Sequence, residues 1–159
     1  MHLREGERIL KVFHHHITPF VGQVLIAIVS TLPFYLLLFA LQGSVSGLAY
    51  FISHIIVFLI FALMISYMTL VFWLDRLVVT NMRVIYINWK TLTIREEAEA
   101  FWEEIQDIHT KEKGVFSYFK FLDYGMIAIQ TAATFGRIEF DYAPDPEGIR
   151  QFIFHVRNQ

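Results

Sequence analysis

The chain lacks cysteine, and for 58 consecutive residues, 17–74, it also lacks Asp, Glu, Lys and Arg. The absence of cysteine excludes disulfides, thiol catalysis and thiolate metal ligands. The absence of charge is local, because charged residues make up 18% of the 159-residue chain and lie on both sides of this gap. A helix of a soluble protein keeps a charged face toward water, so an uncharged stretch of this length indicates a membrane hairpin.

The gap divides into two apolar runs around a short polar break. The runs are residues 17–41 and 48–74, and the break, residues 42–47, reads Gln-Gly-Ser-Val-Ser-Gly. At 1.5 Å of rise per residue, each run is roughly 37 to 40 Å long as a helix, enough to cross a hydrocarbon core of ~30 Å. A cleaved signal peptide has a shorter apolar core and is not followed at once by a second full-length run, so we expect two retained transmembrane helices.

Positive charge flanks this hairpin on one side only. The N-terminal segment, residues 1–16, holds three basic residues, and Arg76 and Arg83 follow the second run, whereas the connecting loop holds none. The positive-inside rule therefore predicts a multi-pass membrane protein with both termini cytoplasmic. Residues 75–159 would form one cytosolic domain, whose 10 basic and 13 acidic residues argue against a nucleic-acid partner.

Gln23 and His54 are the polar side chains of the hairpin that a transport function could use. A neutral histidine near the interface can also simply bond to its own helix, and hydroxyl groups in the runs can bond to the carbonyl one turn back. Pro33 predicts a kink in the first run, with Ser30 and Thr31 nearby to compensate. We treat Gln23 and His54 as a candidate intramembrane polar site and keep a small transport or channel subunit as an alternative function.

The rest of the chain offers no catalytic or cofactor motif. Asp107 and His109 would share one face of a strand, but no Ser stands in a nucleophile elbow and no glycine-rich phosphate loop is present. Adjacent histidines at 14–16 would diverge on a helix, and the glutamates of 96–104 lack the spacing of a calcium loop. We therefore expect no enzyme activity, no cofactor and no metal.

Residues 75–159 alternate between apolar and polar side chains, as strands do. Strands are expected at 77–79, 83–89, 91–98, 105–110, 126–131 and 137–142. Turns are expected at 80–82 and, leading into the next strand, at 88–90. Residues 97–105 would also suit a helix. In the last strand, alternation predicts that Ile138, Phe140 and Tyr142 point inward.

A helix follows the last strand, with Asp145 as N-cap, Pro146 at its first position and an apolar stripe. The stripe, at spacings of i, i+3, i+4 and i+7, comprises Ile149, Phe152, Ile153 and Val156. The pattern predicts an α+β membrane protein in which this helix caps a small antiparallel β half-barrel.

Several segments, in this order, resemble motifs of the bacterial pleckstrin-homology-like (bPH) membrane proteins. The segments are the opening Glu5-Gly6-Glu7-Arg8-Ile9-Leu10, the turn Thr80-Asn81-Met82-Arg83, the strand Glu104-Ile105-Gln106-Asp107-Ile108, the strand 124–132 from Tyr-Gly to Thr-Ala, and the helix start 144–149. The resemblance spans nearly the whole chain. It implies two helices that cross the bacterial inner (cell) membrane and are joined to a PH-like domain, and a binding or scaffolding role rather than catalysis.

The resemblance does not identify a ligand. A phosphoinositide site would gather Lys and Arg around the loop between the first two strands, where the expected turn offers only Arg83, with Lys90 at the next turn. Lipid binding by the domain is therefore a further alternative. Four aromatic residues between lysines can contact the membrane or a partner, or pack on the barrel edge as a short helix. They are Phe116, Tyr118, Phe119 and Phe121.

The sequence as a whole predicts a non-enzymatic module that the lipid bilayer anchors and that binds protein. Small residues in the hairpin and an exposed sheet edge both permit docking of another chain. The expected partner is a second copy of the chain, giving a homo-oligomer, or another membrane protein.

Overall fold

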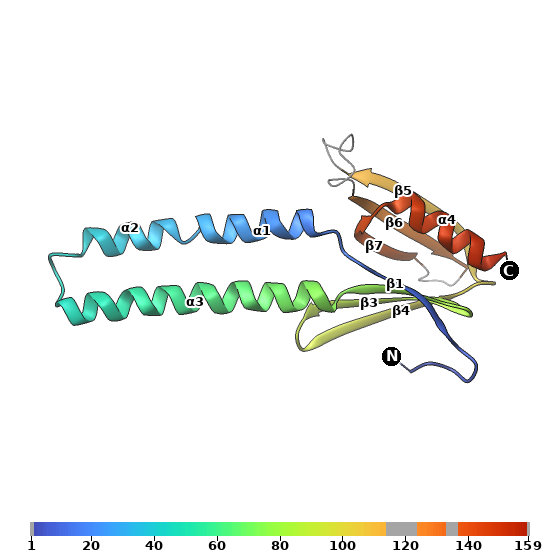
Figure 1. Ribbon diagram of the computed structural model, residues 1–159, viewed down its shortest axis with the longest axis horizontal. Helices are drawn as coiled ribbons and strands as arrows, with labels where there is room; N and C mark the ends of the chain where they lie inside the picture. Colours follow the sequence, from blue (N-terminus) through green and yellow to red (C-terminus); the bar gives the residue numbers. More distant parts are fainter. Residues whose placement is uncertain (1, 114–123, 133–136, 159) are drawn as a thin grey trace. The chain divides into compact units, whose positions relative to one another are not determined.

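The computed structural model describes residues 2–113, 124–132 and 137–158 (Figure 1). Its elements are β1 (Ile9–His14), α1 (Ile17–Val29), α2 (Leu32–Ala40), α3 (Gly47–Leu74), β2 (Arg76–Thr80), β3 (Arg83–Thr91), β4 (Ile94–Phe101), β5 (Ile105–Lys113), β6 (Tyr124–Thr131), β7 (Arg137–Pro144) and α4 (Pro146–Arg157). They form two compact units. One is Ile17–Leu70, and the other combines Met1–His16 with Val71–Gln159.

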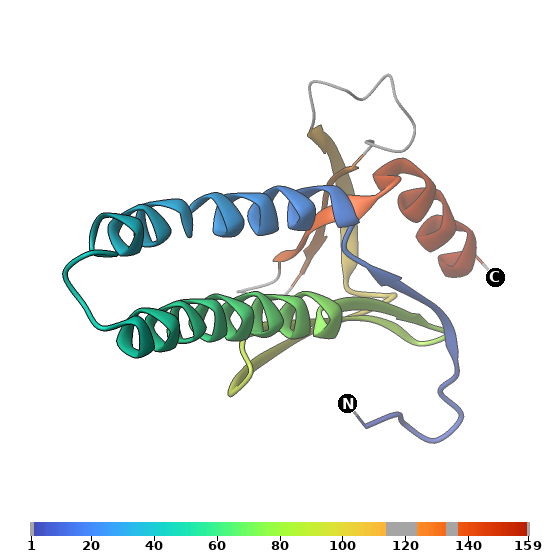
Figure 2. The ribbon, with the colours of Figure 1, turned by 60° about the vertical axis from the view of Figure 1, so that its left-hand side comes forward.

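The first of these units is a helical hairpin, in which α1 and α2 run beside α3 (Figure 2). Ile17–Ala40 and Gly47–Leu74 are long and apolar enough to be candidate membrane spans. The first is interrupted between Val29 and Leu32, as the sequence predicts, because Pro33 has no N–H to donate one turn back. Ser30 and Thr31 bond instead to carbonyls in α1, with Oγ–O distances of 2.8 and 2.7 Å to Ile26 and Ile28.

The second unit contains two antiparallel sheets and one helix. One sheet has the order β1-β2-β3-β4 and the other β5-β6-β7. α4 packs against β5 and β6, and Ile149, Phe152 and Ile153 of its apolar stripe join the core between the sheets. The core consists of apolar side chains from both sheets and α4, among them Leu77, Val79, Val84, Ile108, Ile127, Ile129, Phe140, Ile149 and Ile153. The predicted α+β architecture with a C-terminal helix is confirmed.

The N-terminal segment is part of this sheet unit, whereas the sequence predicts residues 1–16 as a segment apart from the domain. β1 pairs with β2, and His14, its last residue, lies opposite Arg76, the first residue of β2. The whole apolar hairpin is therefore inserted between two neighbouring strands. The strand was missed because only one of its six residues, Phe13, is buried, so no alternation marks it.

The reversal expected from 88–90 lies further along the chain. β3 continues to Thr91, and the turn to β4 is at residues 92–93. Trp89 stays in the strand because Asp75 Oδ1 accepts its backbone N–H at 2.6 Å. β4 then runs to Phe101, so the helical alternative for 97–105 is wrong.

The alternation expected in β7 fails at one position. Ile138 and Phe140 are buried as predicted, whereas Tyr142 is exposed and has a φ of 53°. The register with β6 shifts between Gly125 and Ile127, so β7 contains a bulge. The bulge adds a residue and turns the following side chain to the other face.

The start of α4 is as the sequence predicts. Asp145 Oδ1 accepts the backbone N–H of Gly148 at 2.9 Å, and Pro146 occupies the first turn. A Cβ on Gly148 would lie 2.2 Å from Asp145 Oδ2, so a larger residue there would displace the capping carboxylate. The Arg150 guanidinium bonds to Glu147 in the first turn and lowers the pKa of that carboxyl.

Candidate functional site

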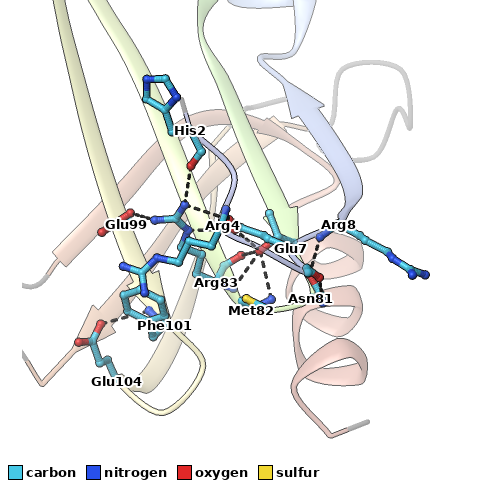
Figure 3. Close-up of polar contacts among 12 residues, drawn as sticks. His2, Arg4, Glu7, Arg8, Asn81, Met82, Arg83, Glu99, Phe101 and Glu104 are labelled. Atoms are coloured by element: carbon cyan, nitrogen blue, oxygen red, sulfur yellow. Dashed lines mark hydrogen bonds and ion pairs between the residues drawn. The ribbon is translucent and has the colours of Figure 1, made fainter.

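A buried ion pair joins the N-terminal segment to the turn between β2 and β3 (Figure 3). Arg83 donates from Nε to Glu7 Oε1 at 2.9 Å and from Nη2 to Glu7 Oε2 at 3.0 Å. The Glu7 side chain is 0% exposed and the Arg83 side chain 7%. Two parallel bonds between a guanidinium and a carboxylate form the strongest geometry available to this pair.

Each carboxylate oxygen of Glu7 also accepts a hydrogen bond from a group other than Arg83. The Thr80 hydroxyl donates to Oε1 at 2.9 Å, and the Arg4 backbone N–H donates to Oε2 at 2.8 Å. These bonds favour the ionised form, and the bond from Arg83 contributes most, so the pKa of Glu7 falls to about 2. The same pairing raises the pKa of Arg83. Both groups are therefore charged at any physiological pH.

The remaining donors of Arg83 are also occupied. Nη1 bonds to Glu99 of β4, and Nη2 donates to the carbonyl of His2 at 3.0 Å. A cavity of about 300 Å³ lies beside this guanidinium, lined by His2, Arg83, Ile85, Glu97 and Glu99. Because Arg83 is surrounded by two carboxylates, it cannot serve as the basic group of a phosphate site.

Asn81 completes this connection. Its Oδ1 accepts the backbone N–H of Arg8 at 2.7 Å, and its Nδ2 donates to the Gly6 carbonyl at 3.1 Å (Figure 3). Gly6 has a φ of 80°, a conformation that favours glycine at this bend. The effect of this cluster is to fasten the chain before the apolar hairpin to the chain after it.

The three adjacent histidines, residues 14–16, lie at the other end of this strand pair, where His14 of β1 is opposite Arg76 of β2. The ring of His15 stacks on Phe140 at 4.7 Å, its Nδ1 lies 2.5 Å from the Asp141 carbonyl, and its Nε2 lies 3.6 Å from Asp75 Oδ2. His14 and His16 instead place their rings beside Trp73 and Tyr124. The three rings thus have separate partners and do not converge on one point.

A second cavity, of about 360 Å³, lies between β3 and β4 on one side and β7 on the other. Its lining residues are Tyr86, Asn88, Glu96, Glu97, Ala98, Arg137, Ile138 and Glu139. Burial, and then the carboxylates of Asp75, Asp141 and Glu96, raise the pKa of the Tyr86 phenol. An acidic cavity of this kind does not suit a phosphate ligand.

The residues proposed from the sequence lie in different parts of the structure. Gln23 is exposed on α1. The His54 Nδ1 lies 2.9 Å from the Tyr50 carbonyl one turn back, and its ring contacts those of Tyr50 and Tyr35. Asp107 and His109 do share a face, with 3.2 Å between Oδ2 and Nε2, but both are more than half exposed.

Four further candidates cannot be placed, because they lie outside the described residues. These are Phe116, Tyr118, Phe119 and Phe121. Within the described ranges, no group of three or more His, Asp or Glu side chains could hold a metal ion.

Sequence reasoning missed Glu7, which lies 76 residues before its partner Arg83. Both belong to segments that resembled family motifs, the opening with Gly6-Glu7 and the turn from Thr80 to Arg83. The signal was therefore present as two separate motifs. Their meeting in space depends on β1 pairing with β2, which was not predicted.

Two solved structures are similar to part of this chain. One is a DUF1696 family protein with a pleckstrin-homology domain from Shewanella loihica PV-4, with 17% identity and a TM-score of 0.40, over 52% of this chain and 70% of that one. The other is a pleckstrin homology domain from Shewanella amazonensis SB2B, with 16% identity and a TM-score of 0.41, over 52% and 66%. A comparison with curated proteins finds no match.

A match to a sequence family covers a larger part of the chain. The sequence model of the bacterial PH domain matches residues 53–153, which include most of α3 and all strands from β2 to β7. The match begins after β1, so the strand that closes the four-stranded sheet at its edge lies outside it. Proteins with PH domains are generally binding modules without catalytic activity. The matched residues make up more than half of the chain, which therefore belongs to the bacterial PH domain family.

Proposed function

We propose that this protein is a non-enzymatic assembly module of the bacterial inner membrane, with its PH-like domain and both termini in the cytoplasm. The apolar length of the two candidate spans and the basic residues on one side of them support this location. The domain would bind protein, either a second copy of the chain or another membrane protein.

The insertion of the hairpin between β1 and β2 carries this proposal. The chain leaves the sheet at His14 and returns at Arg76, and these residues are paired across the two strands. A domain attached by both ends of a hairpin is restrained more than one attached through a single flexible linker. Such a restraint suits a module that presents a fixed surface to partners at the membrane.

Two features support a protein partner. β1 and β4 are outer strands of their sheet, and an outer strand can pair with another chain. In the hairpin, a Cβ added to Gly22 would meet no atom within 4 Å, so a helix of another chain could approach closely there.

The transport alternative gains no comparable support. The hydroxyls of Ser53 and Thr69 bond to carbonyls of their own helix, as Nδ1 of His54 does. Such local bonds satisfy polar groups without a conducting path.

Cross-linking and native mass spectrometry of the detergent-extracted full chain test the proposal. We expect a defined homo-oligomer or a complex with one co-purifying membrane protein. Gly22→Leu should reduce a helix-mediated oligomer, whereas Gly43→Leu, in the connecting loop, should not, although an added Cβ would meet no atom within 4 Å at either position. A monomer without any partner would contradict an assembly role.

A further inference from the structure

The β3–β4 hairpin extends beyond the start of β2. Arg76, the first residue of β2, pairs with Ile87, and β3 continues beyond it to Thr91 beside β4 alone (Figure 1). In this extension Asn88, Trp89 and Thr91 pair with β4, and the register shifts at Lys90. At a rise of ~3.3 Å per residue, this extension is roughly 13 Å long. Its tip consists of residues 91–94, and Leu92 and Thr93 form the turn.

This extension is held at the point where α3 ends. Asp75 directly follows Leu74, the last residue of α3, and its Oδ1 accepts the backbone N–H of Trp89 at 2.6 Å. The last turn of α3 belongs to the same compact unit as the sheet. Trp73 in that turn is 63% exposed. Two tryptophans therefore lie near the end of the candidate span, as interfacial aromatic residues do.

Side-chain chemistry changes in order along the extension. Leu92 and Ile94 at the tip are 38% and 53% exposed. Behind them come Lys90 and Arg95, and the Arg95 guanidinium lies 5.8 Å from the Trp89 ring.

Carboxylates come last in this order. Glu96 lies opposite Asn88, and Glu97 lies opposite Ile87, one and two positions further from the tip than Arg95. They pair with Lys90 and Arg95 from the side away from the tip. The sequence from apolar, through aromatic and basic, to acidic is the order of a membrane surface from the acyl boundary, through the headgroups, to water.

We infer that the β3–β4 tip is a second membrane contact, which inserts into the headgroup layer of the bilayer that the hairpin crosses. Leu92 and Ile94 enter the acyl boundary, while Lys90 and Arg95 reach lipid phosphates. This contact differs from headgroup capture in a pocket, since the two cavities described above each include glutamates in their lining. It rests on the proposed membrane anchoring, and it would fix the orientation of the domain on the bilayer.

The absence of cysteine permits a direct test on the full chain. Leu92→Cys, labelled with an environment-sensitive fluorophore, is reconstituted into vesicles of phosphatidylethanolamine and phosphatidylglycerol. We expect a blue shift of the label's emission, loss of emission with a nitroxide on the lipid near the headgroup, and protection from aqueous iodide.

Two matched positions distinguish failure of this inference from failure of the anchoring. Glu103→Cys, in the turn after β4 at the other end of the sheet, should be quenched by iodide and not by the lipid nitroxide. Ile60→Cys, in the middle of α3, should be quenched by a nitroxide deep in the bilayer. If residue 60 is quenched there while residue 92 behaves like residue 103, the tip contact is refuted and the anchoring stands. If residue 60 is not quenched, the anchoring itself fails.

The same label on residue 92 also shows whether protein, rather than lipid, covers the β3–β4 tip. Protection of residue 92 from both iodide and lipid nitroxide would mean that protein covers the tip, and the lipid assignment would be wrong. Adding Lys90→Gln and Arg95→Gln to Leu92→Cys should reduce lipid quenching in vesicles with phosphatidylglycerol more than in zwitterionic vesicles. Equal effects in both would overturn the role of these cations.

Discussion

The two ends of the four-stranded sheet use their side chains in opposite ways. At the β2–β3 turn, Glu7, Thr80 and Arg83 are buried and bond to one another. At the β3–β4 tip, Leu92 and Ile94 are exposed. A charged group that is fully paired inside the fold has no capacity left for a ligand. Covering exposed apolar surface with a partner, by contrast, lowers the free energy of the system. The turn end therefore maintains the fold, and the tip end presents apolar side chains for contact.

The strongest test of this difference is removal of the buried carboxylate. Glu7→Ala leaves the Arg83 guanidinium without its main partner in a buried site. Breaking a buried pair in this way costs about 3–5 kcal/mol. We expect that loss in the free energy of unfolding of the sheet unit, measured by urea titration of the full chain in detergent micelles with near-UV circular dichroism.

A nearby glutamate provides the matched control for this variant. Glu5 is exposed and lies two residues before Glu7. Glu5→Ala should change the free energy of unfolding by less than about 0.5 kcal/mol. Equal losses for Glu5→Ala and Glu7→Ala would show that the ion pair does not stabilise the turn end.

A second large effect should come from β1, the strand that precedes the apolar hairpin. Phe13 is buried, and its ring meets Phe152 of α4 edge to face at 5.9 Å. Phe13→Ala should cost about 3 kcal/mol, because it leaves a cavity in the core. Leu10→Ala, at an exposed position of the same strand, is the control and should have little effect under the same urea titration. A small loss for Phe13→Ala would remove β1 from the folded sheet.

Prediction from the sequence succeeded where the determinants are local. The alternation of residues 83–89 predicts that Val84 and Tyr86 lie on one face and Ile85, Ile87 and Trp89 on the other, and the two sets pack in separate clusters. The Asp145 cap was also predicted, because its bond spans only three residues.

The candidate site could not be predicted from the sequence, because its determinants are far apart in the chain. Glu7 and Arg83 are adjacent only because β1 and β2 pair across an inserted hairpin, and nothing in either segment specifies the other. Residue patterns of strands also do not mark bulges, so Tyr142 was placed on the wrong face.

Acid should weaken the turn end in a defined pH range. The pKa of Glu7 is lowered from 4.5 to about 2 in the folded protein, chiefly by the bond from Arg83. A lowered pKa means that the stabilisation is present above pH 4.5 and is lost as pH falls toward 2. The effect should be smaller than that of Glu7→Ala, because the protonated side chain still fills its site.

Comparison with Glu7→Gln isolates this carboxylate from all others that titrate. The difference in urea midpoint between the two proteins should be largest near pH 7 and should shrink below pH 4.5. A difference that stays constant down to pH 2 would mean that the ionised form of Glu7 gives the fold no added stability.

The smallest expected effect concerns the tip end, where Asp75 holds the extension of β3. Asp75→Asn keeps an oxygen that can accept the Trp89 N–H but removes the charge that strengthens this bond. The loss should be about 1 kcal/mol and local, seen as roughly fivefold faster hydrogen exchange at the Trp89 amide. Asp107→Asn, which alters an exposed Asp–His pair on β5, is the control and should leave that amide unchanged. If Asp75→Asn instead lowered the urea midpoint as much as Glu7→Ala, both ends of the sheet would be structural, and the contrast between them would disappear.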